Sequence, residues 1–79
     1  MKYVYILHSI AEPGCFYVGL TDDLRARLST HNQGSVARTS KYRPWALKTY
    51  LAFSDPVQGA AFERYLKSGS GRAFAKKRL

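Results

Sequence analysis

Five side chains in the sequence have the chemistry that hydrolysis of a phosphodiester bond requires: Tyr5, Tyr17, Arg27, His31 and Glu63. A carboxylate holds a divalent cation, which stabilises the charge that develops on the leaving oxygen. An arginine presents a planar fork of donors to the scissile phosphate. A histidine, or a tyrosine whose pKa is lowered, accepts a proton from water. Together these residue types are sufficient for metal-assisted cleavage of a nucleic acid.

The two tyrosines lie in segments that are predicted to form a β-hairpin. Residues 2–8 and 15–20 are rich in β-branched and aromatic side chains, and a Pro-Gly turn signal separates them. Apolar side chains on both faces of the first segment indicate a central strand. If the connection is centred near residue 11, Tyr5 and Tyr17 lie directly opposite each other, and their hydroxyl groups project from the same face of the sheet.

The arginine and the histidine lie in a helix that is predicted over residues 22–33. Three side chains could cap its start: Thr21, Asp22 and Asp23. Arg27 and His31 are four residues apart, so they share one face of this helix. We expect that face to be distinct from the apolar stripe formed by Leu24 and Leu28.

The rest of the chain supplies one more strand and two more helices. Residues 35–43 are polar and basic and are interpreted as a loop. A strand is predicted over residues 45–53, with one face made of Leu47, Thr49, Leu51 and Phe53. A Ser-Asp-Pro signal starts the second helix, residues 68–71 end it, and a last helix is expected over 71–78. The predicted order is β-β-α-β-α-α, an α+β fold in which helices flank a three-stranded sheet, with residues 1–79 as one domain.

The charge is distributed unevenly along the chain. Residues 1–34 are neutral, whereas residues 35–79 carry the whole net charge of +8. Such asymmetry favours a polyanionic partner, with nucleic acid preferred over a membrane surface and simple solubility as the alternative. The candidate phosphate contacts are Arg25, Arg38, Lys41, Arg43, Lys67, Arg72, Lys76 and Lys77.

Several classes of protein are excluded by composition. The single cysteine, Cys15, rules out an internal disulfide framework and a thiolate zinc site. No apolar run approaches the roughly 18 residues that a membrane-spanning helix needs, and the N-terminus lacks the pattern of a secretory signal. We therefore expect a cytoplasmic protein that does not associate with membranes.

An ordered set of short motifs resembles the GIY-YIG nuclease family. The tripeptides Tyr3-Val4-Tyr5 and Tyr17-Val18-Gly19 resemble the pair that names it. Arg27 and His31 follow Tyr17 by ten and fourteen residues, where the family has its catalytic arginine and a tyrosine or histidine. Small bacterial members are also similar over three further segments, residues 31–34, 40–45 and 63–67, and at Arg72. The resemblance covers essentially the whole chain.

The resemblance implies both a fold and a reaction. The family has a three-stranded antiparallel sheet flanked by helices, and its relatives include the incision domain of bacterial excision repair. By position, Glu63 would hold one divalent ion, Mg²⁺ or Mn²⁺, and Arg27 would stabilise the phosphoryl transition state. Tyr5 and Tyr17 would orient or activate water and bind phosphate, and His31 would support the site or act as general base. The expected function is a structure- or damage-directed DNA endonuclease in repair or recombination.

Two departures from the family pattern keep other functions open. Leu20 stands where the repair nuclease has a lysine near its catalytic tyrosine, and no asparagine follows Asn32. A nucleic-acid-binding module on a degenerate nuclease fold is therefore one alternative. A basic interaction domain with a protein or membrane partner is another. A monomer is the default expectation, and an activating protein partner stays open.

Each proposed catalytic residue also has a purely structural interpretation. The tyrosines would be half-buried strand aromatics, and His31 would interact with the dipole at the end of its helix. Arg27 would form an ion pair with Asp23, and Glu63 would form one with Lys67. The motif order favours the catalytic interpretation.

Overall fold

The computed structural model describes all 79 residues as an α+β fold in the predicted order of elements. The strands are β1 (Lys2–Ser9), β2 (Phe16–Thr21) and β3 (Trp45–Phe53). The helices are α1 (Leu24–Asn32), α2 (Pro56–Leu66) and α3 (Gly69–Arg78), and a 3₁₀ turn, η1 (Ser40–Tyr42), precedes β3. None of the helices combines the length and the apolar character needed to cross a lipid bilayer.

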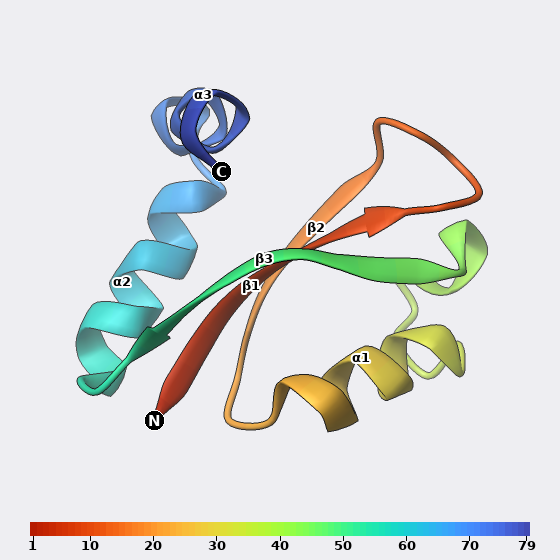
Figure 1. The fold of residues 1–79 in the computed structure, drawn as a ribbon, viewed down its shortest axis with the longest axis horizontal. Helices are drawn as coiled ribbons and strands as arrows, with labels where there is room; N and C mark the ends of the chain where they lie inside the picture. The colour runs from red at the N-terminus through yellow and green to blue at the C-terminus, as the bar shows by residue number, and fades with distance from the viewer.

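β1 is the central strand, as its apolar residues on both faces predicted. The strands form an antiparallel sheet in the order β2-β1-β3. Figure 1 shows α1 on one side of this sheet and α2 with α3 on the other. Val4 and Ile6 pack with Leu66 of α2, whereas Tyr5 and Leu7 pack on the opposite face. Helices from the two sides therefore reach opposite faces of the same strand.

Side-chain caps fix where the helices begin. Asp23 and Asp55 each accept a hydrogen bond from a backbone amide inside the helix that follows, at 3.1 and 2.9 Å. The Ser68 hydroxyl accepts one from the amide of Gly71 at 3.1 Å. The last helix therefore begins at Gly69, two residues before its predicted start, because the serine acts as its cap.

The pairing of β1 with β2 corrects the expected position of the two tyrosines. Tyr5 pairs with Gly19, and Tyr17 pairs with Leu7. The turn is centred one residue later than expected, and Gly14 within it has a φ of 95°, which a glycine adopts without strain. Tyr5 and Tyr17 are consequently diagonal rather than direct partners. They still share a face, with ring centroids 6.3 Å apart.

A bulge in β3 corrects the predicted face of that strand. Ile6 pairs with Thr49, but the next residue of β1, Leu7, pairs with Leu47, so Lys48 is an extra residue between the two pairs. Because cross-strand partners share a face, Leu47 lies on the face of Leu7, opposite to the remaining members of its predicted set. The period-2 pattern could not predict this, because a bulge shifts the alternation by one residue.

Candidate active site

The inner face of α1 carries the arginine and the histidine toward the sheet. Leu24 and Leu28 pack against the cluster around Tyr5, and His31 is fully buried. Arg27 is half-buried beside them. The expectation of two distinct faces was wrong, because spacings of three and four residues place all four side chains on one side of a helix.

Arg27 and His31 both contact the hydroxyl group of Tyr5. The Nε of Arg27 donates to the Tyr5 oxygen at 3.4 Å, and His31 Nε2 lies 3.0 Å from the same oxygen. The carboxylate of Asp23 caps α1 instead of forming the alternative ion pair with Arg27. A strand tyrosine and two residues of the following helix thus form one hydrogen-bonded group.

The direction of these hydrogen bonds follows from the chemistry of the groups. An arginine can only donate, so the Tyr5 oxygen accepts from Arg27 and its own proton is available for His31 Nε2. His31 Nδ1 then carries the ring proton and donates it to the Thr39 hydroxyl, 2.8 Å away. That hydroxyl donates in turn to the carbonyl oxygen of Val36 at 3.4 Å. In this arrangement every group in the chain has a partner.

The electrostatics of the site agree with that arrangement. Burial raises the pKa of the Tyr5 phenol, although the hydrogen bond from Arg27 opposes the effect. Burial, together with the charge of Arg27, lowers the pKa of His31. The hydrogen bond to Tyr5 raises the pKa of Arg27. At neutral pH the site therefore holds a protonated phenol, a neutral imidazole and a guanidinium ion.

Thr39 belongs to this site although no sequence signal indicated it. It lies in the segment that was interpreted as a loop, and it is almost completely buried. The indole N–H of Trp45 donates to its carbonyl oxygen at 2.8 Å. The side chain of Asn32 holds the backbone of Trp45 with two hydrogen bonds, of 2.6 and 3.0 Å. These contacts fix the loop, and the loop positions the hydroxyl that sets the tautomer of His31.

Tyr17 lies beside the hydrogen-bonded group. Its ring centroid is 4.8 Å from that of His31, and its side chain is half-buried. Its phenol contributes to the raised pKa of Arg27, so the guanidinium lies close to both tyrosines. The structure therefore brings together four of the five predicted catalytic residues on the α1 side of the sheet.

Glu63 lies in α2, on the other side of the sheet from α1. Its side chain is only 16% exposed, and it forms an ion pair with Lys67, one turn later in the helix. Its charge contributes to the raised pKa of Tyr5, so the carboxylate lies within electrostatic reach of that phenol. The structural alternative for Glu63 is thus a real contact, and among the other candidate residues the carboxylate acts electrostatically on Tyr5. Its catalytic role stays a prediction.

A glycine is required where the Tyr5 ring crosses β2. A Cβ atom at Gly19 would lie 2.3 Å from both the Cζ and the hydroxyl oxygen of Tyr5. No side chain fits in that space, so the last residue of the second tripeptide lets the ring reach across β2 toward α1. Gly19 is therefore required for packing of the site, in addition to being part of the tripeptide that resembles the family motif.

The residues present fit a hard divalent cation that keeps most of its water. No group of three or more histidine, cysteine or acidic side chains is close enough together to ligate a metal ion. A transition-metal site of the zinc type, with all ligands from the protein, is therefore absent. Magnesium is commonly bound by one or two carboxylates together with water and substrate phosphate. Glu63 supplies one such carboxylate.

Four of the eight predicted phosphate contacts line one cleft. Arg38, Lys67, Arg72 and Lys76 surround a cleft of about 920 Å³, which is also lined by Tyr17. These four residues come from the loop before β3 and from the end of α2 and α3. The cleft thus brings basic residues of the C-terminal half of the chain beside one residue of the candidate active site, Tyr17.

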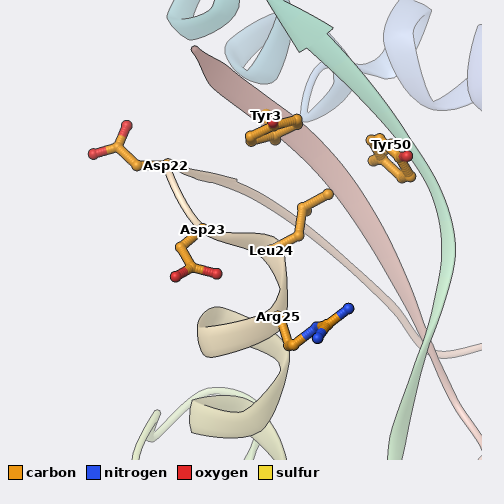
Figure 2. Close-up of a pocket in the computed structure, with 6 residues that line it drawn as sticks. All are labelled: Tyr3, Asp22, Asp23, Leu24, Arg25 and Tyr50. Carbon is orange, nitrogen blue, oxygen red and sulfur yellow. The ribbon is translucent and has the colours of Figure 1, made fainter.

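The other four predicted contacts lie outside this cleft: Arg25, Lys41, Arg43 and Lys77. Arg25 lines a shallow pocket at the start of α1, which it shares with Asp22 and Asp23. Figure 2 shows its side chain extending away from the two carboxylates. Arg43 donates to the carbonyl oxygen of Ser40 at 2.7 Å. The structure does not bring these four together, and their contacts with nucleic acid stay predictions.

Comparison with known proteins identifies the family. The profile of the GIY-YIG catalytic domain matches residues 1–78. The chain belongs to the GIY-YIG nuclease family. The three-stranded antiparallel sheet with its helices is consistent with a GIY-YIG domain, and the family membership expected from the motifs is confirmed.

The similar proteins include small bacterial chains and one large eukaryotic subunit. The UPF0213 protein of Lacticaseibacillus paracasei is 38% identical over 66 residues, which cover 82% of this chain and 72% of the relative. A UPF0213 protein of Streptococcus pyogenes serotype M3 is 33% identical over 72 residues, or 90% of this chain and 76% of the relative. The structure-specific endonuclease subunit SLX1 of Debaryomyces hansenii is 35% identical over 66 residues, which are 76% of this chain and 19% of that subunit.

The lowered pKa of His31 predicts how stability depends on pH. Between its folded pKa and the ordinary value of 6.5, the unfolded chain binds more protons at this residue than the folded chain. The free energy of unfolding should therefore fall as the pH falls below about 6.5, by at most about 1.4 kcal/mol per pH unit for one proton. Denaturant unfolding across this pH range measures the slope. His31→Gln should flatten it and His8→Gln should not; an unchanged slope in His31→Gln would contradict the assignment.

Proposed function

We propose that this GIY-YIG domain is a metal-dependent DNA endonuclease that recognises DNA structure or damage and acts in repair or recombination. The observation that supports this best is the hydrogen-bonded group of Arg27, Tyr5 and His31 beside Tyr17, with the Glu63 carboxylate in electrostatic reach. The similarity to a structure-specific endonuclease subunit supports a substrate defined by shape rather than by a long sequence. All five groups come from one chain, so a monomer is sufficient for one cut.

Glu63 would hold the divalent ion, Mg²⁺ or Mn²⁺. A bound ion of this kind supplies positive charge at the oxygen that leaves in hydrolysis. Lys67 neutralises the carboxylate in the structure, so ion binding requires the ammonium group to move away. The released ammonium, half-exposed at the edge of the cleft, would be free to contact a phosphate of the substrate.

Arg27 would bind the scissile phosphate. Its Nε is engaged by the Tyr5 oxygen, which leaves the two terminal nitrogens as donors for phosphate oxygens. A guanidinium ion that is already held in place stabilises developing negative charge without reorganising. Tyr5 is thus proposed as a positioning residue, since it is buried and fixes the arginine.

The two remaining residues differ in access to solvent. Tyr17 is half-buried whereas Tyr5 is buried, so Tyr17 is the tyrosine proposed to orient the attacking water. His31 is fully buried with both ring nitrogens engaged, so a proton can reach it only through the hydroxyl groups of Tyr5 and Thr39. We therefore propose that His31 maintains the hydrogen-bonding state of Tyr5 and does not contact the water.

The test is a cleavage assay with labelled duplex, flap, branched and single-stranded DNA, in Mg²⁺, Mn²⁺ or chelator. We expect cutting of one or more of the branched forms, complete dependence on the added ion, and restoration of activity when the ion is returned. The rate should also fall steeply with salt, because phosphate contacts release counterions. Binding without cutting in either ion would contradict the nuclease proposal and favour a degenerate binding module.

A further inference from the structure

A cleft on the α2 and α3 side of the sheet has the composition of a single-strand binding groove. Its floor is apolar and includes Ile6, Val18 and Leu66. Its rim carries the four basic residues described above and Lys48, the extra residue of the β3 bulge. No acidic residue lines it. This combination of an apolar floor and a positive rim is complementary to a chain of bases with phosphates along it.

One aromatic residue of the cleft has no structural explanation. Phe16, at the start of β2, lines the cleft and is 57% exposed. Its pairing partner is His8, at the end of β1. In Figure 1 this hairpin end of the sheet lies away from α2 and α3, which cover the face further along. A phenyl ring that no helix covers is available for stacking.

The apolar floor distinguishes between single-stranded and double-stranded ligands. In a duplex the bases are stacked and paired inside, so the backbone offers little that an exposed phenyl ring can contact. Unpaired bases present their flat faces, and stacking on an aromatic side chain contributes about 1–3 kcal/mol per base. A purely electrostatic duplex site would have no use for Phe16 or for the apolar floor beneath it.

Two residues of the cleft also belong to the surroundings of the candidate active site. Tyr17 lines it, and so does Lys67, the ion-pair partner of Glu63. A strand that occupies the cleft would therefore pass Lys67, beside the carboxylate that is proposed to hold the divalent ion. Its volume of about 920 Å³ is at the upper end of the range of pockets that hold ring-containing ligands.

We propose that this cleft binds a short unpaired stretch of DNA, with a base stacked on Phe16 and phosphates on the surrounding lysines and arginines. The inference deepens the proposed function, on which its DNA ligand rests, by assigning the substrate as one that has a single-stranded segment next to the cut. Flapped and branched DNA have such a segment, and intact duplex does not.

The experiment measures binding without cleavage, by fluorescence anisotropy of labelled oligothymidine and of a blunt duplex in chelator. Phe16→Ala should weaken oligothymidine binding by about fivefold to a hundredfold, which corresponds to loss of one stacked base. Duplex binding should change less than about twofold, since the substitution removes no charge. Phe16→Trp, which restores an aromatic face, should bind oligothymidine as the wild type does.

Two controls separate stacking from other effects. Tyr50→Ala removes an aromatic side chain of similar exposure, 51%, that lies outside the cleft, and it should leave binding unchanged. Arg72→Gln should weaken both ligands and reduce the salt slope for oligothymidine by about 0.7. Equal affinity of Phe16→Ala and wild type for oligothymidine, or an equal loss for duplex, would overturn the proposal.

Failure of this proposal and failure of the nuclease proposal have different signatures. If the wild-type protein cuts DNA and Phe16→Ala binds oligothymidine as the wild type does, the nuclease proposal is supported and the proposed single-strand binding cleft is contradicted. If Phe16→Ala selectively loses oligothymidine binding but the wild type shows no metal-dependent cutting, the nuclease proposal is contradicted. The cleft would then be the single-strand binding site of a binding module.

Discussion

Glu63→Gln is expected to reduce DNA cleavage by at least on the order of a thousandfold and to leave the fold and DNA binding intact. Glutamine keeps the shape of the side chain but removes the charge that would hold a divalent ion. Loss of the ion removes several kcal/mol of transition-state stabilisation, and each 1.36 kcal/mol corresponds to a factor of ten in rate. The expected effect is therefore on the rate constant of cleavage, and DNA binding measured without the divalent ion should change little.

Stability should change little in this variant. The substitution breaks the ion pair with Lys67, whose side chain is about half exposed. Helical pairs of this spacing contribute about 0.3–0.5 kcal/mol when exposed, so the free energy of unfolding should fall by less than about 1 kcal/mol. Thermal unfolding and circular dichroism check this directly.

The matched control is Glu12→Gln, which removes the same charge from an exposed position in the β1–β2 connection. Single-turnover cleavage of the best substrate, in saturating Mg²⁺, compares the two variants with the wild type. Glu12→Gln should cut at the wild-type rate. Equal cleavage by Glu63→Gln would remove Glu63 from the mechanism, and equal loss in both variants would indicate a general effect of net charge.

The elements of this fold could be predicted because their signals are local. The Asp23 and Asp55 caps lie beside the helices that they start, and a capping hydrogen bond spans only two or three residues. The apolar residues of β1 likewise indicated a strand buried on both faces before any partner was known. A helix or strand whose signals lie within its own residues can therefore be predicted from the sequence alone.

The wrong predictions concern the pairing and the faces of strands, where a shift of one residue changes which side chains are partners and which face they occupy. Tyr5 and Tyr17 were expected as direct partners, but the turn is displaced by one residue and makes them diagonal. Leu47 was assigned to the wrong face because the bulge at Lys48 reverses the alternation. Both shifts depend on how loops and neighbouring strands pack, and no pattern within a single strand encodes them.

Two features of the candidate site depend on tertiary contacts alone. Thr39 is a polar residue in a polar loop, and only the contacts of that loop with Trp45 and Asn32 carry its hydroxyl to His31. Glu63 lies 32 residues beyond His31, so its approach to Tyr5 depends on how α2 packs on the sheet. The family motifs supplied the candidate residues, and the packing determines how these residues lie relative to one another.

Arg27→Gln is expected to reduce cleavage by about a hundredfold to a thousandfold, the usual effect of removing one preorganised donor to a developing charge. Glutamine still reaches toward the Tyr5 hydroxyl but has neither the positive charge nor the second terminal nitrogen for phosphate. Arg27→Lys should not restore the rate, because an ammonium ion is a point charge and cannot hold both Tyr5 and a phosphate in a planar fork.

The control for this prediction is Arg25→Gln, which removes the same charge from an exposed position two residues earlier in α1. It should change affinity for DNA modestly and leave the single-turnover rate at saturating DNA unchanged. Arg27→Gln should show the reverse, a large loss of rate at saturating DNA. If Arg27→Gln lost only affinity, the arginine would bind ground state and transition state equally. Its hydrogen bond to Tyr5 would then stabilise the fold and not the reaction, and the proposed use of its two free nitrogens would be wrong.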